Sequence, residues 1–170
     1  MRIVRRVFLA LALSLPGTFA DAGPREDLAA IFSQDMASLD LAATKIAIDR
    51  MIDPSIDAGA QLAEIDRMAA EVRAMIPLGA DSWQKVEVLR RYIYQPGAWN
   101  DGRAFAYDLE DPLGEDIRNK LMSDYLTDRR GNCITMPFLF IILGERVGLD
   151  VRPALAPLHV LVKFRDDAGR

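Results

Sequence analysis

Hydrophobic residues recur at helical spacing through the first two thirds of the chain. Leu28, Ile31 and Phe32 start a pattern of three- and four-residue steps, which continues less regularly until Asp53-Pro54. Apolar side chains at this spacing share one face of a helix. The pattern therefore predicts amphipathic helices that pack on a common core.

Two later helices are more clearly delimited. Asp57 can cap one that ends at Pro77, and Asp81 or Ser82 can cap the next, which ends at Pro96. Their regular apolar stripes indicate core packing and no cofactor site. The positions expected to be buried are Leu62, Ile65, Met68, Val72 and Met75 in the first helix, and Trp83, Val86, Leu89 and Ile93 in the second.

Between residues 95 and 116 the regular pattern disappears. Pro and Gly are frequent there, and Trp99, Phe105 and Tyr107 lie among them. Loops of this length in a compact domain are usually functional or disordered, and the aromatic residues argue against disorder. We expect this loop to pack over another part of the protein, and a short helix to follow from Ile117.

An almost uniformly apolar run from Cys133 to Val147 predicts a central helix that stops at Gly148. Asn132 is a favourable cap for it. Pro137 has no N–H to donate to the Cys133 carbonyl. Either the helix starts nearer Thr135, or its first turn is irregular.

The period then changes from helix to strand. Val151 to Leu155 is one short extended run, and His159 opens a second, in which Val160, Val162 and Phe164 alternate with other residues. The predicted fold class is α+β: a helical N-terminal part, then a central cysteine-bearing helix packed on a small antiparallel sheet.

Residues 1–22 have the three parts of an export signal in order. Basic residues at Arg2, Arg5 and Arg6 precede an apolar run, Val7 to Leu15, and the small-x-small site Ala20-Asp21-Ala22 follows. The apolar run is shorter than the roughly 20 residues that span a bilayer. A buried amphipathic first helix is the alternative.

With the signal removed, we expect no integral membrane segment and a periplasmic or secreted protein. The remainder, residues 23–170, is expected to form a single domain. It comprises a helical part (25–95), the long loop (95–116) and a catalytic-type core (117–170).

Composition narrows the classes of function. The 170 residues are 51% hydrophobic and 27% charged, which suits one ordinary core and excludes a disordered chain. The net charge of -4 does not suit a surface that neutralises phosphates, so we expect no nucleic-acid partner. A single Cys and a single His fall short of the usual metal ligand set, and we expect no metal or cofactor. The oligomeric state is not determined by these patterns.

Cys133 is the only cysteine and cannot form an internal disulfide. It is buried and inert, paired with another chain, or kept for its reactivity. In the first turn of a helix, unpaired backbone N–H groups would favour the thiolate, and Arg129 and Arg130 could add to that field. His159, the only histidine, is either a structural residue at a strand start or the base that thiol catalysis needs.

Three segments carry a resemblance: Arg130-Gly131-Asn132-Cys133, Gly148-Leu149-Asp150-Val151 and Ala156-Pro157-Leu158-His159-Val160. They resemble the core of the transglutaminase-like superfamily, and the chain is most similar to exported relatives of the SirB1 proteins. The resemblance implies a papain-like α+β fold, with Cys133 as nucleophile and His159 as general base. Many SirB1 proteins lack the Cys, so its presence favours retained activity.

The resemblance also implies an oxyanion hole and an orienting Asp. The backbone N–H of Cys133 is one expected donor to the oxyanion, and Trp99 is a candidate for another, unless it only pins the loop to the core. The strand that should carry the orienting Asp is not present, and Asp166 and Asp167 have the pattern of turn residues. We therefore expect a truncated product or a fragment, with weakened activity.

Two classes of function remain. The first is an exported cysteine-dependent amide hydrolase or acyltransferase, which attacks a peptide or protein amide through Cys133 with His159 as base. The second is a catalytically weak or inactive module of the same fold that binds peptides or protein partners.

Overall fold

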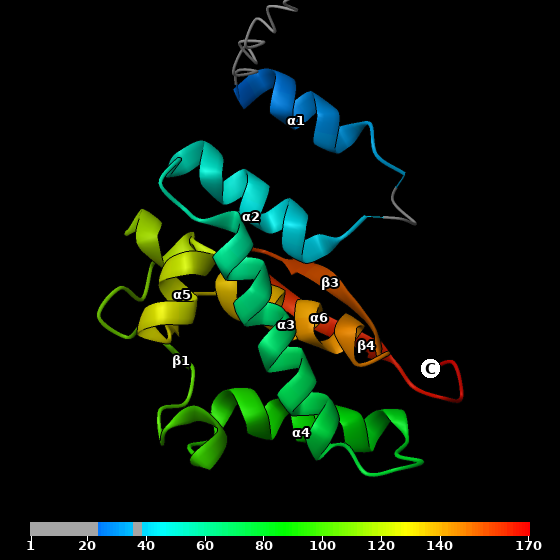
Figure 1. Ribbon diagram of the computed structural model, residues 1–170. Coiled ribbons are helices and arrows are strands. Elements are labelled where there is room, and N and C mark those ends of the chain that lie inside the picture. The colour runs from blue at the N-terminus through cyan, green and yellow to red at the C-terminus, as the bar shows by residue number, and fades with distance from the viewer. Residues whose placement is uncertain (1–23, 36–38) are drawn as a thin grey trace, which may run out of the picture.

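The computed structural model describes residues 24–35 and 39–170 (Figure 1). The predicted export signal lies outside these residues. The observed fold is α+β, as the sequence predicts. The helices are α1 (Pro24–Phe32), α2 (Leu41–Ile52), α3 (Ala58–Met75), α4 (Ser82–Tyr94), α5 (Met122–Asp128) and α6 (Thr135–Arg146), with the 3₁₀ turns η1 (Ala98–Asn100) and η2 (Ile117–Lys120). The strands are β1 (Ala106–Tyr107), β2 (Arg130–Gly131), β3 (Asp150–Ala156) and β4 (His159–Arg165).

Aspartate side chains fix where three of the helices begin. Asp40, Asp57 and Asp81 each accept a hydrogen bond from a backbone N–H in the first turn of α2, α3 and α4, respectively. Such caps satisfy donors that the helix itself leaves unpaired. The predicted cap of α3 is confirmed, and of the two candidates for α4 the structure uses Asp81.

Helix α6 is the centre of the molecule. It packs against α3, α4 and α5 and against both strands of the hairpin β3–β4, and Figure 1 shows it enclosed between them. Leu139, Ile141 and Leu143 have no exposed surface. A helix surrounded in this way has to be apolar on nearly all sides, which explains the continuous hydrophobic run.

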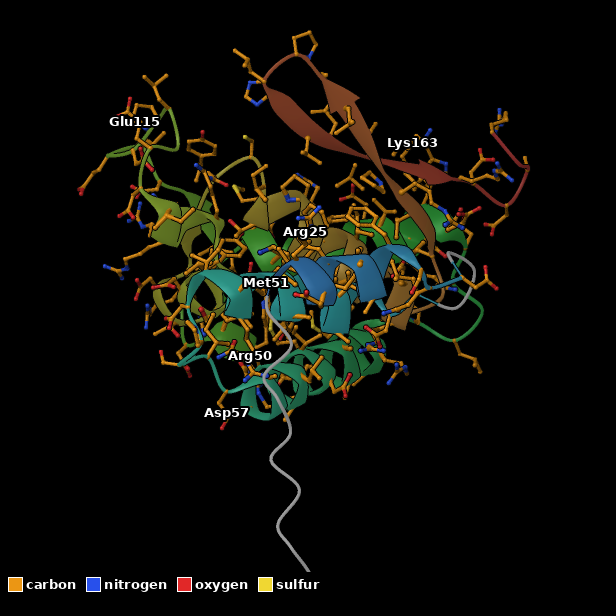
Figure 2. All side chains as sticks on the ribbon, turned by 90° about the horizontal axis from the view of Figure 1, so that it is seen from above. Arg25, Arg50, Met51, Asp57, Glu115 and Lys163 are labelled. Atoms are coloured by element: carbon orange, nitrogen blue, oxygen red, sulfur yellow. The ribbon has the colours of Figure 1, made fainter. Side chains whose placement is uncertain are left out.

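The hairpin β3–β4 is stabilised by α6. Its register pairs Val151 with Phe164 and Pro153 with Val162, so these four side chains share one face. Val151 is 1% exposed, and Phe164 and Val162 pack against the core. The opposite face is free among the described residues, and Figure 2 shows the hairpin, marked by Lys163, standing out from the helical body. Packing on α6 explains how two strands persist where an isolated pair would be marginal.

Trp83 is an exception to the predicted core. It is 56% exposed, whereas Val88, five residues further on, is buried. Trp83 lies in the first turn of α4, and its ring meets that of Phe164 on β4 edge-on at 4.6 Å between centroids. The prediction that Trp83 is buried was wrong.

The long loop packs on the segment just before Cys133, as expected. Strand β1 pairs in parallel with β2, so that Ala106 lies beside Arg130 and Tyr107 beside Gly131. The single short helix expected from Ile117 is instead divided. Ile117 begins η2 and is 46% exposed, and α5 begins only at Met122. No helix in the described part of the chain is both long and apolar enough to cross a bilayer.

Candidate functional site

Cys133 lies in the turn between β2 and α6. Helix α6 begins at Thr135, which is one of the two alternatives that Pro137 left open. The Cys133 side chain is a free thiol of intermediate exposure. Cys133 therefore lies two residues before the regular helix and is partly accessible from solvent.

Buried polar side chains hold this turn. The Asn132 side-chain oxygen accepts the N–H of Ile134 at 2.9 Å, and the Thr135 hydroxyl accepts the N–H of Asn132 at 3.1 Å. The same hydroxyl donates to the Asn119 carbonyl at 3.0 Å. The N–H of Cys133 has no acceptor within residues 24–35 and 39–170. The turn thus leaves one donor free at the residue that carries the thiol.

Glycines make the close packing of the turn possible. A Cβ at Gly131 would lie 2.2 Å from the Thr135 hydroxyl oxygen and 2.6 Å from the Tyr125 ring. Gly114, in the long loop, has φ 68°, and a Cβ there would come within 3.0 Å of the Asn132 amide nitrogen. The loop is therefore pressed against the residue that precedes Cys133.

The Cys133 thiol contacts the hairpin turn. Its Sγ donates to the Leu158 carbonyl at 3.7 Å. Leu158 has φ 64°, in the left-handed region, and follows Pro157 in the two-residue connection between β3 and β4. Leucine in this region costs on the order of 1–2 kcal/mol, and such strain concentrates at functional sites.

His159 follows Leu158, but its imidazole is exposed and has no hydrogen-bond or ion-pair partner among the described residues. The register pairs it with Ala156, on the same face as the pair Arg152 and Lys163. This is the face opposite to the one that packs on α6. The structure thus brings Cys133 and His159 into the same neighbourhood through the main chain of Leu158, without a direct thiol–imidazole hydrogen bond.

Trp99 lies in η1, the 3₁₀ turn that follows α4. Its indole N–H donates to the Tyr92 carbonyl at 3.1 Å, and the Arg91 guanidinium lies 5.8 Å from the ring centroid. Gly97 makes room for the ring, since a Cβ there would lie 2.4 Å from it. To serve as an oxyanion donor, the Trp99 N–H would have to leave this bond.

Comparison with known protein families gives one match for this chain. A family model described as the transglutaminase-like superfamily matches residues 60–170, which include the loop, the Cys133 turn and the hairpin. The chain belongs to the transglutaminase-like superfamily. The comparisons with curated proteins and with solved structures gave no significant match.

The two arginines upstream of the cysteine differ in their partners. In this transglutaminase-like chain, Arg129 donates to the carbonyls of Asn100 and Arg103 and stacks on Phe105 at 5.4 Å from the ring centroid. The Arg129 guanidinium therefore binds the long loop and not the Cys133 thiol. Arg130 is exposed on β2.

The two aspartates at the end of the chain are turn residues in the structure, as predicted. Asp166 accepts the N–H groups of Ala168 and Arg170, and the Asp167 carboxylate accepts the N–H of Ser82 at 2.8 Å. Hydrogen bonds to Ser82 hold the pKa of Asp167 below its usual range. Neither side chain is bonded to His159.

In the described residues, no three His, Cys, Asp or Glu side chains converge as a metal site would require. A cavity of about 350 Å³ beside β2 has a lining of mixed charge. Arg118 in this lining is paired with Asp124 and Asp128, and Asn119 donates to Asp108. The lining residues are Asp108, Glu110, Asp116, Arg118, Asn119, Asp128 and Arg130.

Neither Thr135 nor Asn119 was predicted from the sequence as a residue of the site. Both are buried, at 0% and 8% exposure, and both support the Cys133 turn. Thr135 had one available signal, because it is a polar residue within the apolar run that forms α6. Asn119 had none, since its contact with Thr135 depends on how the loop folds back.

Proposed function

We propose that this transglutaminase-like protein is an exported cysteine-dependent amide hydrolase or acyltransferase, in which Cys133 is the nucleophile and His159 the general base. The observation that carries the proposal is a partly exposed thiol at the start of a buried helix, in contact with the turn that leads to His159. Membership of the superfamily supports the same chemistry. We further propose a relationship to exported SirB1 proteins, a periplasmic or secreted location, and a peptide or protein amide as substrate.

The proposed reaction proceeds in two balanced steps. The Cys133 sulfur attacks the amide carbon, with its proton taken by His159, and the carbonyl oxygen becomes an oxyanion near the free N–H of Cys133. The C–N bond then breaks, and the imidazolium returns the proton to the leaving amine. Water or a second amine then attacks the thioester carbon and gives a proton to His159; the C–S bond breaks, the acid or the new amide leaves, and the imidazolium returns the proton to the Cys133 sulfur.

His159 has to approach the thiol for this reaction. The register of β4 directs the His159 side chain to the outer face of the hairpin. The Cys133 thiol is hydrogen-bonded to the Leu158 carbonyl instead. Leu158 lies at the end of a two-residue turn and has a strained backbone conformation. A change in that conformation would break the hydrogen bond to the thiol and move His159, the first residue of β4.

The same contacts favour the second candidate, a weak or inactive module that binds peptides or protein partners. In such a module the thiol would remain bonded to the Leu158 carbonyl, and His159 would serve only as an exposed surface residue. The two candidates differ in one measurable property, the reactivity of the thiol.

The rate of alkylation by iodoacetamide at pH 6 separates them. A catalytic Cys133 should react about tenfold faster than free cysteine, since the gain in thiolate exceeds the accompanying loss of nucleophilicity. His159→Ala should abolish this advantage. Lys163→Ala, on the same face of β4, is the matched control and should leave the rate unchanged. A thiol that titrates near 8.5 and is indifferent to His159→Ala would support the binding module.

A further inference from the structure

We infer that Thr135 is a positioning residue for acyl transfer, which keeps the Cys133 N–H free and aimed at the oxyanion. The inference rests on the proposed function, because an oxyanion forms only if Cys133 attacks a carbonyl group. Thr135 does not itself touch the substrate in this proposal. It acts through Asn132 and the backbone of the turn.

The backbone donors on either side of Cys133 are both held by side chains. The N–H of Asn132 is bound by the Thr135 hydroxyl, and the N–H of Ile134 by the Asn132 side chain. The N–H of Cys133, which lies between them, has no acceptor within the part of the chain that the structure describes. With both neighbouring peptide units fixed, the direction of the Cys133 N–H is fixed as well.

The Thr135 hydroxyl has no freedom to turn away. It donates to the Asn119 carbonyl and accepts from Asn132, and its residue has 0% exposure. Gly131 and Tyr125 close in on it, since a Cβ at Gly131 would collide with both. The Asn119 amide is in turn bonded to the carboxylate of Asp111 at 2.8 Å, which links the turn to the long loop.

Removing the Thr135 hydroxyl should therefore slow the acylation of Cys133 more than its alkylation. Thr135→Val keeps the shape of the side chain, but it leaves the buried N–H of Asn132 without an acceptor, so the turn shifts to relieve it. Attack on a carbonyl needs the oxyanion donor, whereas displacement of iodide from iodoacetamide forms no oxyanion. A positioning role predicts loss of acylation with alkylation retained.

The experiment compares two reactions of the full chain at the same pH. In the first, p-nitrophenyl acetate acylates Cys133: the S–C bond forms, the ester C–O bond breaks, and p-nitrophenolate leaves with the electron pair. In the second, iodoacetamide alkylates the same sulfur. Thr135→Val should lower the acylation rate about 30-fold and the alkylation rate by less than about twofold. Thr135→Ser, which retains the hydroxyl, should restore acylation to within about threefold of wild type.

Thr127 provides the matched control. It is an exposed threonine on α5 whose hydroxyl donates to the Ser123 carbonyl at 2.9 Å, so Thr127→Val makes the same chemical change away from the turn. It should change neither rate. Thermal unfolding checks that each variant is folded. If Thr135→Val does not fold, Thr135→Ala and Thr135→Ser, which differ by the hydroxyl alone, give the same comparison.

Four results would overturn the inference. Equal losses of acylation and alkylation in Thr135→Val would mean that the hydroxyl only supports the fold. Unchanged acylation, or no rescue by Thr135→Ser, would mean that it does not position the donor. If wild-type Cys133 reacts with p-nitrophenyl acetate no faster than free cysteine does, the proposed function fails first and the inference fails with it.

Discussion

Gly131 is the residue on which the geometry of the cysteine turn depends most directly. It pairs with Tyr107 in the parallel bridge and stands two residues before Cys133. The Thr135 hydroxyl and the Tyr125 ring occupy the space where any side chain would begin. Both neighbours are fully buried, so neither can move aside without disturbing the core.

Gly131→Ala should therefore destabilise the protein. The expected loss is about 1–3 kcal/mol, the usual cost of forcing an extra methyl group into a packed core. Gly59→Ala is the control, because the nearest atom to its Cβ is 3.4 Å away and the site lies in α3. Alanine in a helix should be neutral or stabilise by about 0.5–1 kcal/mol. Urea unfolding measures both variants, and equal stabilities would contradict the packing described.

Helices α2 and α5 are joined by a buried ion pair. Lys45 and Asp49, 6% and 2% exposed, are paired within α2. Asp49 also accepts the N–H of Met122 at 2.8 Å, and Lys45 donates to the Lys120 carbonyl at 2.8 Å. Burial lowers the pKa of Lys45, and the carboxylate of Asp49 opposes this effect. The pair thus anchors the start of α5, which leads to β2 and Cys133.

Asp49→Ala should cost about 3–5 kcal/mol, because it leaves the Lys45 ammonium buried without its counter-ion. The double variant Lys45→Met with Asp49→Leu should recover only part of this loss. The N–H of Met122 and the carbonyl of Lys120 would still lack their partners. Glu64→Ala, which breaks an exposed pair with Arg67, should cost less than about 1 kcal/mol. An Asp49→Ala variant as stable as Glu64→Ala in denaturant unfolding would refute this role.

At the scale of the whole molecule, the end of the chain is fastened to α4. The Asp167 carboxylate accepts the N–H of Ser82, and the N–H of Asp167 donates to the Ser82 hydroxyl at 3.2 Å. The contact joins the last strand to a helix 85 positions earlier in the sequence. It closes the hairpin against the helical body at the end opposite to Leu158.

The contact should weaken in acid. Since the pKa of Asp167 is lowered in the folded protein by its bonds to Ser82, its stabilisation is complete above the unfolded pKa of about 3.9 and is lost as the pH falls through the folded value. Asp167→Ala should therefore unfold at a lower temperature than wild type at neutral pH, and the difference should vanish in strong acid. Glu110→Ala, at an exposed loop position, is the control. A difference that persists unchanged below pH 3 or so would contradict the assignment.

Local signals explain how much of this fold was predictable from the sequence. Such signals act over a few residues: the structure confirms Asp57 as a cap, one of the two candidates for the next cap, Asp81, and the alternation from Val160 to Phe164. The exposure of Trp83 depends on how far the hairpin reaches across α4, which no local pattern encodes. The support for Cys133 was missed for the same reason, because Thr135 meets Asn119 across 16 residues.

The positions of Cys133 and His159 were also predictable only in part. Their neighbourhood was predicted from the segments that resemble the superfamily, and a start of α6 near Thr135 was one of the two alternatives that Pro137 left open. The direction of His159 was not predictable, because it is set by the number of residues in the turn at Leu158. A shift of one residue in that register would move the imidazole to the other face.

The hairpin β3–β4 also affects how readily the protein aggregates, because each of its two strands has one edge unpaired among the described residues. A strand with unpaired edge groups is a template on which another chain can add, and natural proteins suppress this with charge. Arg152, Lys163 and Arg165 lie on the outward face of β3–β4, all exposed, with Asp150 as the acidic neighbour. Two copies that approached hairpin to hairpin would bring like charges together, so these cations act as gatekeepers against edge-to-edge aggregation.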